Sequence, residues 1–261
     1  MSPLREITHT MSAVPMHQIF DYIPFHEGSR KGNALAEEVY EHILREIVFP
    51  GEDPETQIHY AGKITESVVA KELQVSNGPV REAFYRLRQE GWLYTDRNRG
   101  SFLVDFSDPE IALDIYRFRV NFETGSFYGL ASNISDEQLA VLGRIIERMD
   151  KAMQSSDINV FRQEDIHFHL TVNEMAGGPQ YVRVYRPKLM QWYAMAYQVL
   201  VRSMGTQQYS TLLEAPGMST HRELYDALVR RSSQDAAELI SRHFLYIFKL
   251  LNLSSDKSQN S

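Results

Sequence analysis

The stretch from Ser76 to Val104 constrains the fold of this chain more than any other part. Between residues 78 and 90, apolar side chains recur at helical spacing, which predicts a helix of about three turns with one face in a core. These apolar positions are Val80, Ala83, Phe84 and Leu87. The polar face carries Arg81 and Arg88, and Gly91 follows the helix as its end. From residue 92 to 104, apolar and polar residues alternate around a basic tip at 96–100, which indicates a small hairpin.

A second amphipathic pattern lies just upstream, from Ile64 to Leu73, and three residues separate it from the first. Two short helices joined by a tight turn and followed by a basic hairpin form a winged helix-turn-helix, whose second helix enters the major groove of DNA. A further apolar stripe predicts a supporting helix from Asn33 to about Phe49, which Pro50 and Gly51 end.

Composition narrows the class of protein. With 261 residues, 43% of them hydrophobic, the chain can form two modest domains. Its net charge of -7 argues against a protein that coats nucleic acid, but a local basic surface suffices for specific binding. The absence of cysteine excludes disulfides and cysteine zinc sites and fits a cytoplasmic location. No apolar run reaches the ~18 residues of a membrane span, so we expect no membrane partner.

The patterns divide the chain into domains and connecting segments. Residues 1–31 read as a flexible N-terminal arm, 32–104 as the winged helix-turn-helix, 105–108 as a linker, 109–253 as a helical domain and 254–261 as a disordered tail. Asp108 and Pro109 form a strong helix start at the boundary. We expect helices near 108–131, 135–154, 157–176, 179–204, 219–231 and 233–252. The predicted fold class is mainly α, with an N-terminal winged helix-turn-helix and a C-terminal all-α antiparallel bundle.

Four polar residues of the helical domain are candidates for a buried site. Asp165 and His169 are four residues apart, so they project from one helix face about a turn from each other. This spacing suits two metal ligands, and it equally suits a hydrogen-bonded pair. His221 and His243 lie on two later helices, and His243 stands in an apolar run where an imidazole needs a polar partner. A bound cation would supply that partner.

Several short motifs of the winged region identify a family. The chain contains Pro50-Gly51, then the run from Ser76 to Ala83 (SNGPVREA), then Glu90-Gly91-Trp92 and Arg99-Gly100-Ser101-Phe102. These motifs resemble those of the GntR family of bacterial transcription regulators over about seventy residues. Asn77 stands where most of the family has arginine, so we expect an altered base or phosphate contact, and the operator preference of relatives does not carry over. The resemblance implies DNA contacts at Ser67, Ser76, Asn77, Gly78, Arg81, Arg99 and Gly100. One recognition helix covers only a half-site, so we expect a homodimer on a palindromic double-stranded operator.

The C-terminal half is similar to the ligand-binding domain of the FadR-type branch of that family. Its metal-binding members carry an Asp-x-x-x-His and two later histidines about twenty-two residues apart, which Asp165, His169, His221 and His243 match in order. The resemblance implies a divalent metal, with zinc expected and nickel or manganese as alternatives. It also implies a small carboxylate effector, for which we expect Arg119 and Asn173 as polar contacts, because an arginine fork suits a carboxylate.

The combined interpretation is a ligand-responsive DNA-binding transcription regulator, expected to be a repressor and not an enzyme. The expected route from ligand to DNA is the first bundle helix and the 105–108 linker. Two alternatives stay open at this point. The first is a metal-dependent hydrolase fused to a DNA-binding module, since one aspartate and three histidines could activate water. The second is a regulator whose metal is purely structural.

Overall fold

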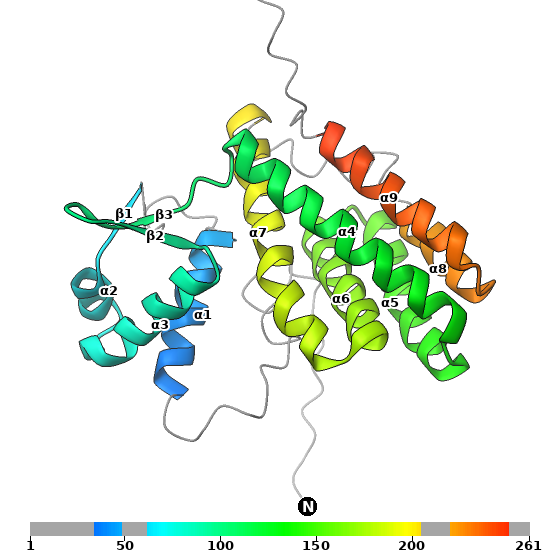
Figure 1. Cartoon of the computed structure of the whole chain (residues 1–261), viewed down its shortest axis with the longest axis horizontal. Coiled ribbons are helices and arrows are strands. Elements are labelled where there is room, and N and C mark those ends of the chain that lie inside the picture. Colours follow the sequence, from blue (N-terminus) through cyan, green and yellow to red (C-terminus); the bar gives the residue numbers. More distant parts are fainter. Residues whose placement is uncertain (1–33, 49–61, 205–219, 251–261) are drawn as a thin grey trace, which may run out of the picture.

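The computed structural model describes residues 34–48, 62–204 and 220–250. A small winged part and a larger helical bundle lie side by side, with α7 of the bundle at the boundary between them (Figure 1). The expected N-terminal arm, the polar tail from 254 and the proposed ends of the supporting helix at Asn33 and Phe49 lie outside the described residues. Among the described residues, no helix has the length and the apolar run that crossing a membrane requires.

In the winged part, residues 34–48 and 62–104 form three helices and a three-stranded antiparallel sheet. Its elements are α1 (Ala34–Val48), β1 (Lys63–Ile64), α2 (Glu66–Glu72), α3 (Asn77–Gln89), β2 (Leu93–Asp96) and β3 (Gly100–Leu103). The strand order is β1-β3-β2, and Tyr94 of β2 lies opposite Phe102 of β3. The winged helix-turn-helix that the sequence predicts is confirmed. The prediction that Ile64 begins a helix is wrong, because Ile64 pairs with Ser101 of β3 and α2 begins only after Thr65.

Helix α3 ends with a glycine in the left-handed conformation. Gly91 adopts a left-handed conformation with φ of 79°, which glycine reaches without steric cost. The Trp92 amide donates to the Leu87 carbonyl at 2.8 Å, and the Gly91 amide donates to the Arg88 carbonyl at 3.1 Å, which is the Schellman pattern. The chain therefore turns back immediately after α3, and Trp92 enters the core without any exposed surface.

The bundle contains six helices within the described residues. They are α4 (Pro109–Asn133), α5 (Asp136–Gln154), α6 (Ile158–Gly177), α7 (Pro179–Met204), α8 (Thr220–Val229) and α9 (Ser233–Leu250). Asp108 caps α4 by accepting from the amides of Glu110 and Ile111, and Ser135 forms a capping box with Gln138 at the start of α5. The mainly α fold class is confirmed, and each helix begins and ends within a few residues of its expected position.

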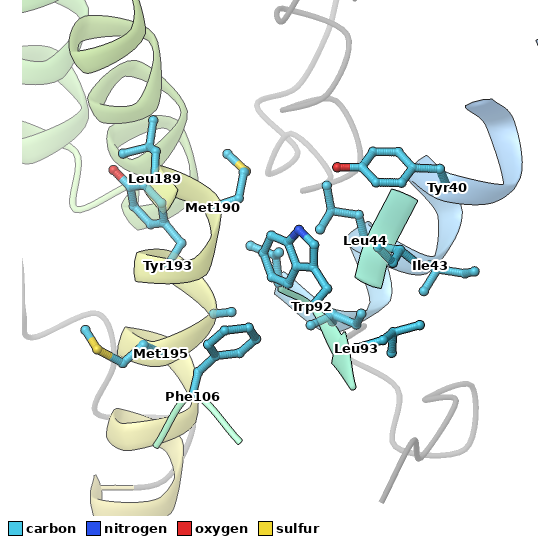
Figure 2. Close-up of a cluster of buried hydrophobic side chains, with 14 of the residues drawn as sticks. Tyr40, Ile43, Leu44, Trp92, Leu93, Phe106, Leu189, Met190, Tyr193 and Met195 are labelled. Atoms are coloured by element: carbon cyan, nitrogen blue, oxygen red, sulfur yellow. The ribbon is translucent and has the colours of Figure 1, made fainter. Parts of the chain in front are cut away.

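The described residues form two hydrophobic cores. One fills the interior of the bundle between α4, α5, α6, α8 and α9. The other begins in the winged part and continues into α7, where Trp92 packs with Phe106 and Met190 (Figure 2). The rings of Trp92 and Phe106 meet edge to face with centroids 5.3 Å apart, so the expected 105–108 linker contributes a buried residue to this core. The expectation that the linker and the first bundle helix are the sole route between the two parts is therefore wrong, since α7 packs on the winged part directly.

Candidate metal centre and DNA-reading surface

The four predicted metal ligands come together inside the bundle. Asp165 and His169 project from α6, while His221 comes from the first turn of α8 and His243 from α9. The ligand nitrogens of the three histidines lie within 4.8 Å of one another, and all three side chains are buried. Asp165 joins through its Oδ1 atom, which lies 2.6 Å from His221 Nε2 and 3.4 Å from His169 Nε2.

Neighbouring side chains fix how two of the imidazoles face. Nδ1 of His169 lies 2.5 Å from Glu123 Oε2, and because a carboxylate only accepts, this nitrogen is the donor and Nε2 faces the cluster. Nδ1 of His243 lies 2.6 Å from the hydroxyl of Thr220, the first residue of α8. Such outer hydrogen bonds are the usual way in which proteins orient metal-binding histidines.

The pKa values of ionisable groups in the cluster shift in different directions. Burial lowers the pKa of His243 well below its ordinary value, and the neighbouring His221 and His169 lower it further, so this imidazole is neutral, as metal binding requires. Burial acts in the same direction on His169, but Glu123 and Asp165 outweigh it and raise the pKa of that imidazole. Burial raises the pKa of the Asp165 carboxyl, yet His221 and His169 overcome this and hold the pKa well below its usual range.

The geometry of the cluster fits a cation. Tetrahedral bonds of ~2.1 Å to a metal separate neighbouring ligand atoms by roughly 3.4 Å, and His169 Nε2 lies 3.4 Å from both His221 Nε2 and Asp165 Oδ1. Asp165 Oδ1 is buried and makes no aligned hydrogen bond, despite its short distance to His221. Three imidazoles and a carboxylate are donors that zinc, nickel and manganese accept.

A second layer of residues surrounds the cluster, and sequence reasoning missed most of it. Tyr193 of α7 donates a hydrogen bond to Asp165 Oδ2, and Tyr185 of α7 donates one to Glu123. Nothing in the sequence pattern of α7 distinguishes these tyrosines from core aromatics. The pairing of Glu123 with Arg119 could have been predicted from the sequence, because Glu123 follows Arg119 by four residues and lies on the same helix face.

The two predicted effector contacts lie beside the cluster, and each has an internal partner. Arg119 is 1% exposed, and its guanidinium bonds the Glu123 carboxylate at 2.9 Å and the Tyr185 hydroxyl at 3.0 Å. Asn173 accepts from the Ser126 hydroxyl and donates to the His169 carbonyl, both at 2.7 Å. In this state both side chains therefore brace the cluster.

The predicted DNA contacts form one exposed set on the winged part. All seven are exposed: Ser67 on α2, Ser76 at the N-cap of α3, Asn77, Gly78 and Arg81 on α3, and Arg99 and Gly100 at the hairpin. The Arg81 side chain is 71% exposed and lies 3.5 Å from Glu66, and that of Arg99 is 72% exposed and lies 3.6 Å from Asp96. Such loosely paired arginines can exchange their partners for phosphate or base edges.

Arg86 differs from the other arginines of this region. Its guanidinium binds Glu37 at 2.7 Å and Glu90 at 2.9 Å and stacks on the Tyr40 ring at 3.7 Å. Its charge is thus neutralised inside the winged part, where it joins α1 to α3. The basic surface that faces outward is smaller than a count of arginines between residues 81 and 99 implies.

Comparison with known proteins gives the context of both sites. The model of the FCD domain matches residues 114–245, which is just over half of the chain. The chain is 30% identical over 109 residues to the Nta operon transcriptional regulator of Aminobacter aminovorans, covering 41% of this chain and 51% of that protein. It is 31% identical over 109 residues to the gluconate operon transcriptional repressor of Bacillus licheniformis, covering 42% and 44% respectively. These matches span about half the length of the curated relatives.

Solved structures agree on the fold. Escherichia coli McbR/YncC superposes with a TM-score of 0.64 at 17% identity, over 84% of this chain and 97% of that one. A putative GntR transcriptional regulator from Rhodococcus sp. RHA1 gives 0.61 at 19% identity, over 84% and 96%. At these identities the likeness concerns the fold alone, and it includes both the winged part and the bundle. Together with the FCD match, it means that the chain belongs to the GntR family of transcriptional regulators, in the group that carries an FCD domain.

Proposed function

We propose that the chain is a metal-dependent, ligand-responsive DNA-binding regulator. In this proposal a homodimer reads a palindromic operator with α3 and the hairpin of each subunit, and it acts as a repressor. The exposed set around Arg81 and Arg99 supports operator reading by α3 and the hairpin, because these side chains can reach phosphates and base edges. The name of one relative, a gluconate operon repressor, supports the proposed role as a repressor.

The observation that carries the proposal is the convergence of Asp165, His169, His221 and His243 from three helices. These residues would hold a divalent cation, zinc in the first instance and nickel or manganese as alternatives. Four protein ligands leave positions open on a five- or six-coordinate ion, and the bound cation would there supply a Lewis acid for the oxygen of a small organic acid. A ligand at this point contacts α6, α8 and α9 together and can therefore bias their packing.

Arg119 and Asn173 remain our proposed polar contacts for that acid. Arg119 is bonded to Glu123 and Tyr185, and in this proposal the incoming carboxylate takes the place of Glu123 on the guanidinium. The buried guanidinium then stays paired with a carboxylate, and the Glu123 carboxylate keeps its bonds to His169 and Tyr185. Binding of the acid would consequently loosen the brace on His169.

A hydrolytic role is less well supported. A water activated by the metal needs a base beside it, and Glu123, the carboxylate that adjoins the cluster through His169, is tied to three neighbours. Burial opposes ionisation of Glu123, but His169 and Arg119 prevail and lower the pKa of its carboxyl, which makes it a weak proton acceptor. A regulatory use of the cluster fits this arrangement better.

The test begins with metal content. Purified protein should contain about one divalent ion per chain, and His243→Ala should lose it, while His167→Ala, a histidine of the same bundle outside the cluster, should keep it. Operator fragments selected from genomic DNA should bind the wild type, and candidate acids should change that affinity only when metal is present. Turnover of esters or lactones would favour the hydrolase, and unfolding on chelation without any response to acids would favour a structural metal.

A further inference from the structure

Helix α7 is buried on all sides along its middle. Seven consecutive residues, from Leu189 to Met195, are buried, and a helix that is covered all round needs a partner on each face. One face packs on the bundle and the other on the winged part, as Figure 1 shows for the ribbon and Figure 2 for the side chains around Trp92. This helix therefore touches both halves of the proposed regulator.

The bundle face of α7 reaches the ligand cluster. The hydroxyl of Tyr193 donates to Asp165 Oδ2, the oxygen that is not directed at the histidines. Leu189 and Tyr185, one and two turns earlier on the same face of α7, are also fully buried. Tyr185 donates to the Glu123 carboxylate, which orients His169. A change in how Asp165 is held must therefore alter a hydrogen bond of α7.

The opposite face of α7 reaches the end of the recognition helix. Gln191 is 1% exposed, and its Nε2 donates to the Glu90 carbonyl at 2.7 Å. Glu90 is the C-cap of α3, so this bond satisfies a carbonyl that the helix itself leaves open. Lys188, one turn earlier, donates to Gln191 Oε1 at 2.8 Å and holds the amide in this orientation.

The end of α3 is tied to the rest of the winged part at the same place. The Glu90 side chain accepts from the Tyr40 hydroxyl at 2.5 Å, from Arg86 at 2.9 Å and from the Trp92 indole at 3.3 Å. A shift of Glu90 thus moves α1 and α3 together, and with them the exposed residues on α3. Gln191 therefore bonds a residue that is itself held by side chains of α1 and α3.

We propose that α7 couples the ligand cluster to the recognition helix, with Tyr193 sensing Asp165 and Gln191 positioning the C-terminal end of α3. The two side chains are two residues apart on opposite faces of one helix, so a rotation or shift of α7 that follows Asp165 also displaces the Glu90 carbonyl. The inference rests on the proposed function, because it requires the cluster to bind a metal. Coupling of ordinary size changes an equilibrium constant by about 5- to 150-fold.

Hydrogen exchange of full-length protein with and without zinc ions tests the inference. In the wild type, saturating zinc should change the exchange of amides in the segment 88–93 by about fivefold or more. Gln191→Ala should abolish this change while its affinity for zinc stays that of the wild type, because Gln191 touches no ligand. Val184→Ala, at an exposed position of the same helix, should behave as the wild type. Tyr193→Phe, which removes only the hydroxyl, should also abolish the change when zinc is saturating.

The outcomes separate the inference from the function on which it rests. If the wild type binds zinc but exchange in 88–93 stays constant, or if Gln191→Ala and Tyr193→Phe both keep the change, α7 is not the coupling element and the metal proposal stands. Absence of binding for zinc, nickel and manganese overturns both. Should Gln191→Ala unfold, the Tyr193→Phe result decides alone, since that substitution keeps the buried ring.

Discussion

The proposed metal cluster and the proposed DNA-binding surface are built on opposite principles. In the cluster, buried polar side chains contact one another in series, as in the chain from Asp165 through His169 and Glu123 to Arg119. On the surface, Arg81 and Arg99 have one distant acidic neighbour each and most of their area in water. Changes in the cluster should therefore alter stability and metal binding together, whereas truncation of an exposed arginine on the surface should alter DNA affinity with little effect on stability.

The largest expected effect comes from breaking the buried pair beside the cluster. Arg119→Met leaves the Glu123 carboxylate buried without its guanidinium, which should lower the free energy of unfolding by about 3 to 5 kcal/mol in urea titrations. Arg222→Met removes an arginine whose pair with Asp150 is only partly buried, and it should cost at most about 1 kcal/mol. Equal losses of unfolding free energy in the two variants would mean that the buried pair of Arg119 contributes no more to stability than a pair near the surface.

A smaller effect should follow from weakening the support of His169. Glu123→Gln keeps the shape of the side chain but removes the charge that accepts from His169 Nδ1. Loss of such an outer partner typically lowers metal affinity about 10- to 100-fold, which competition with a zinc chelator would measure. Glu164→Gln is the matched control, because this carboxylate lies on the same helix as His169 but binds Arg148. Unchanged zinc affinity in Glu123→Gln would mean that His169 does not depend on Glu123 for its orientation.

On the surface, Arg81→Ala should affect DNA and little else. If Arg81 reads a base, specific affinity should fall by about 1 to 3 kcal/mol, and if it contacts phosphate, the slope of affinity against salt should decrease by about one. The free energy of unfolding should stay within about 0.5 kcal/mol of the wild type, since the side chain is exposed. Arg117→Ala, an exposed arginine on α4, should change neither quantity. Wild-type affinity and salt dependence in Arg81→Ala would remove α3 from the proposed interface.

The two regions also differ in how much of them the sequence predicts. The face of α3 follows from apolar spacing within one helix, and the pairing of Asp165 with His169 follows from a separation of four residues. Both depend on local geometry. The apolar surroundings of His243 made it and His221 candidates, and family resemblance then implied that they join Asp165 and His169 in one ligand set. The strand at Ile64 was missed because two residues are too few for an alternating pattern. Gln191 was missed, and Tyr193 was expected only as a core or cavity-lining aromatic, because their partners are set by packing between distant elements, which no local pattern encodes.

Gly78 allows the smallest and most discriminating test of the surface. It lies in the first turn of α3, outside the left-handed region, and an added Cβ would meet nothing closer than Ser76 Oγ at 4.0 Å. Replacement of glycine by alanine at such a position should stabilise the fold by about 0.4 to 1 kcal/mol, because it restricts the unfolded chain.

The same methyl group would stand on the proposed DNA face, where glycine lets the backbone approach a phosphate closely. We therefore expect Gly78→Ala to raise the midpoint of unfolding and to lower operator affinity in the same protein. Gly125→Ala on α4, where the added Cβ also meets nothing within 4 Å, should raise stability without changing DNA binding. If Gly78→Ala kept full operator affinity, the start of α3 would not lie against the DNA backbone, and the contacts assigned to Ser76 and Asn77 would lose their support.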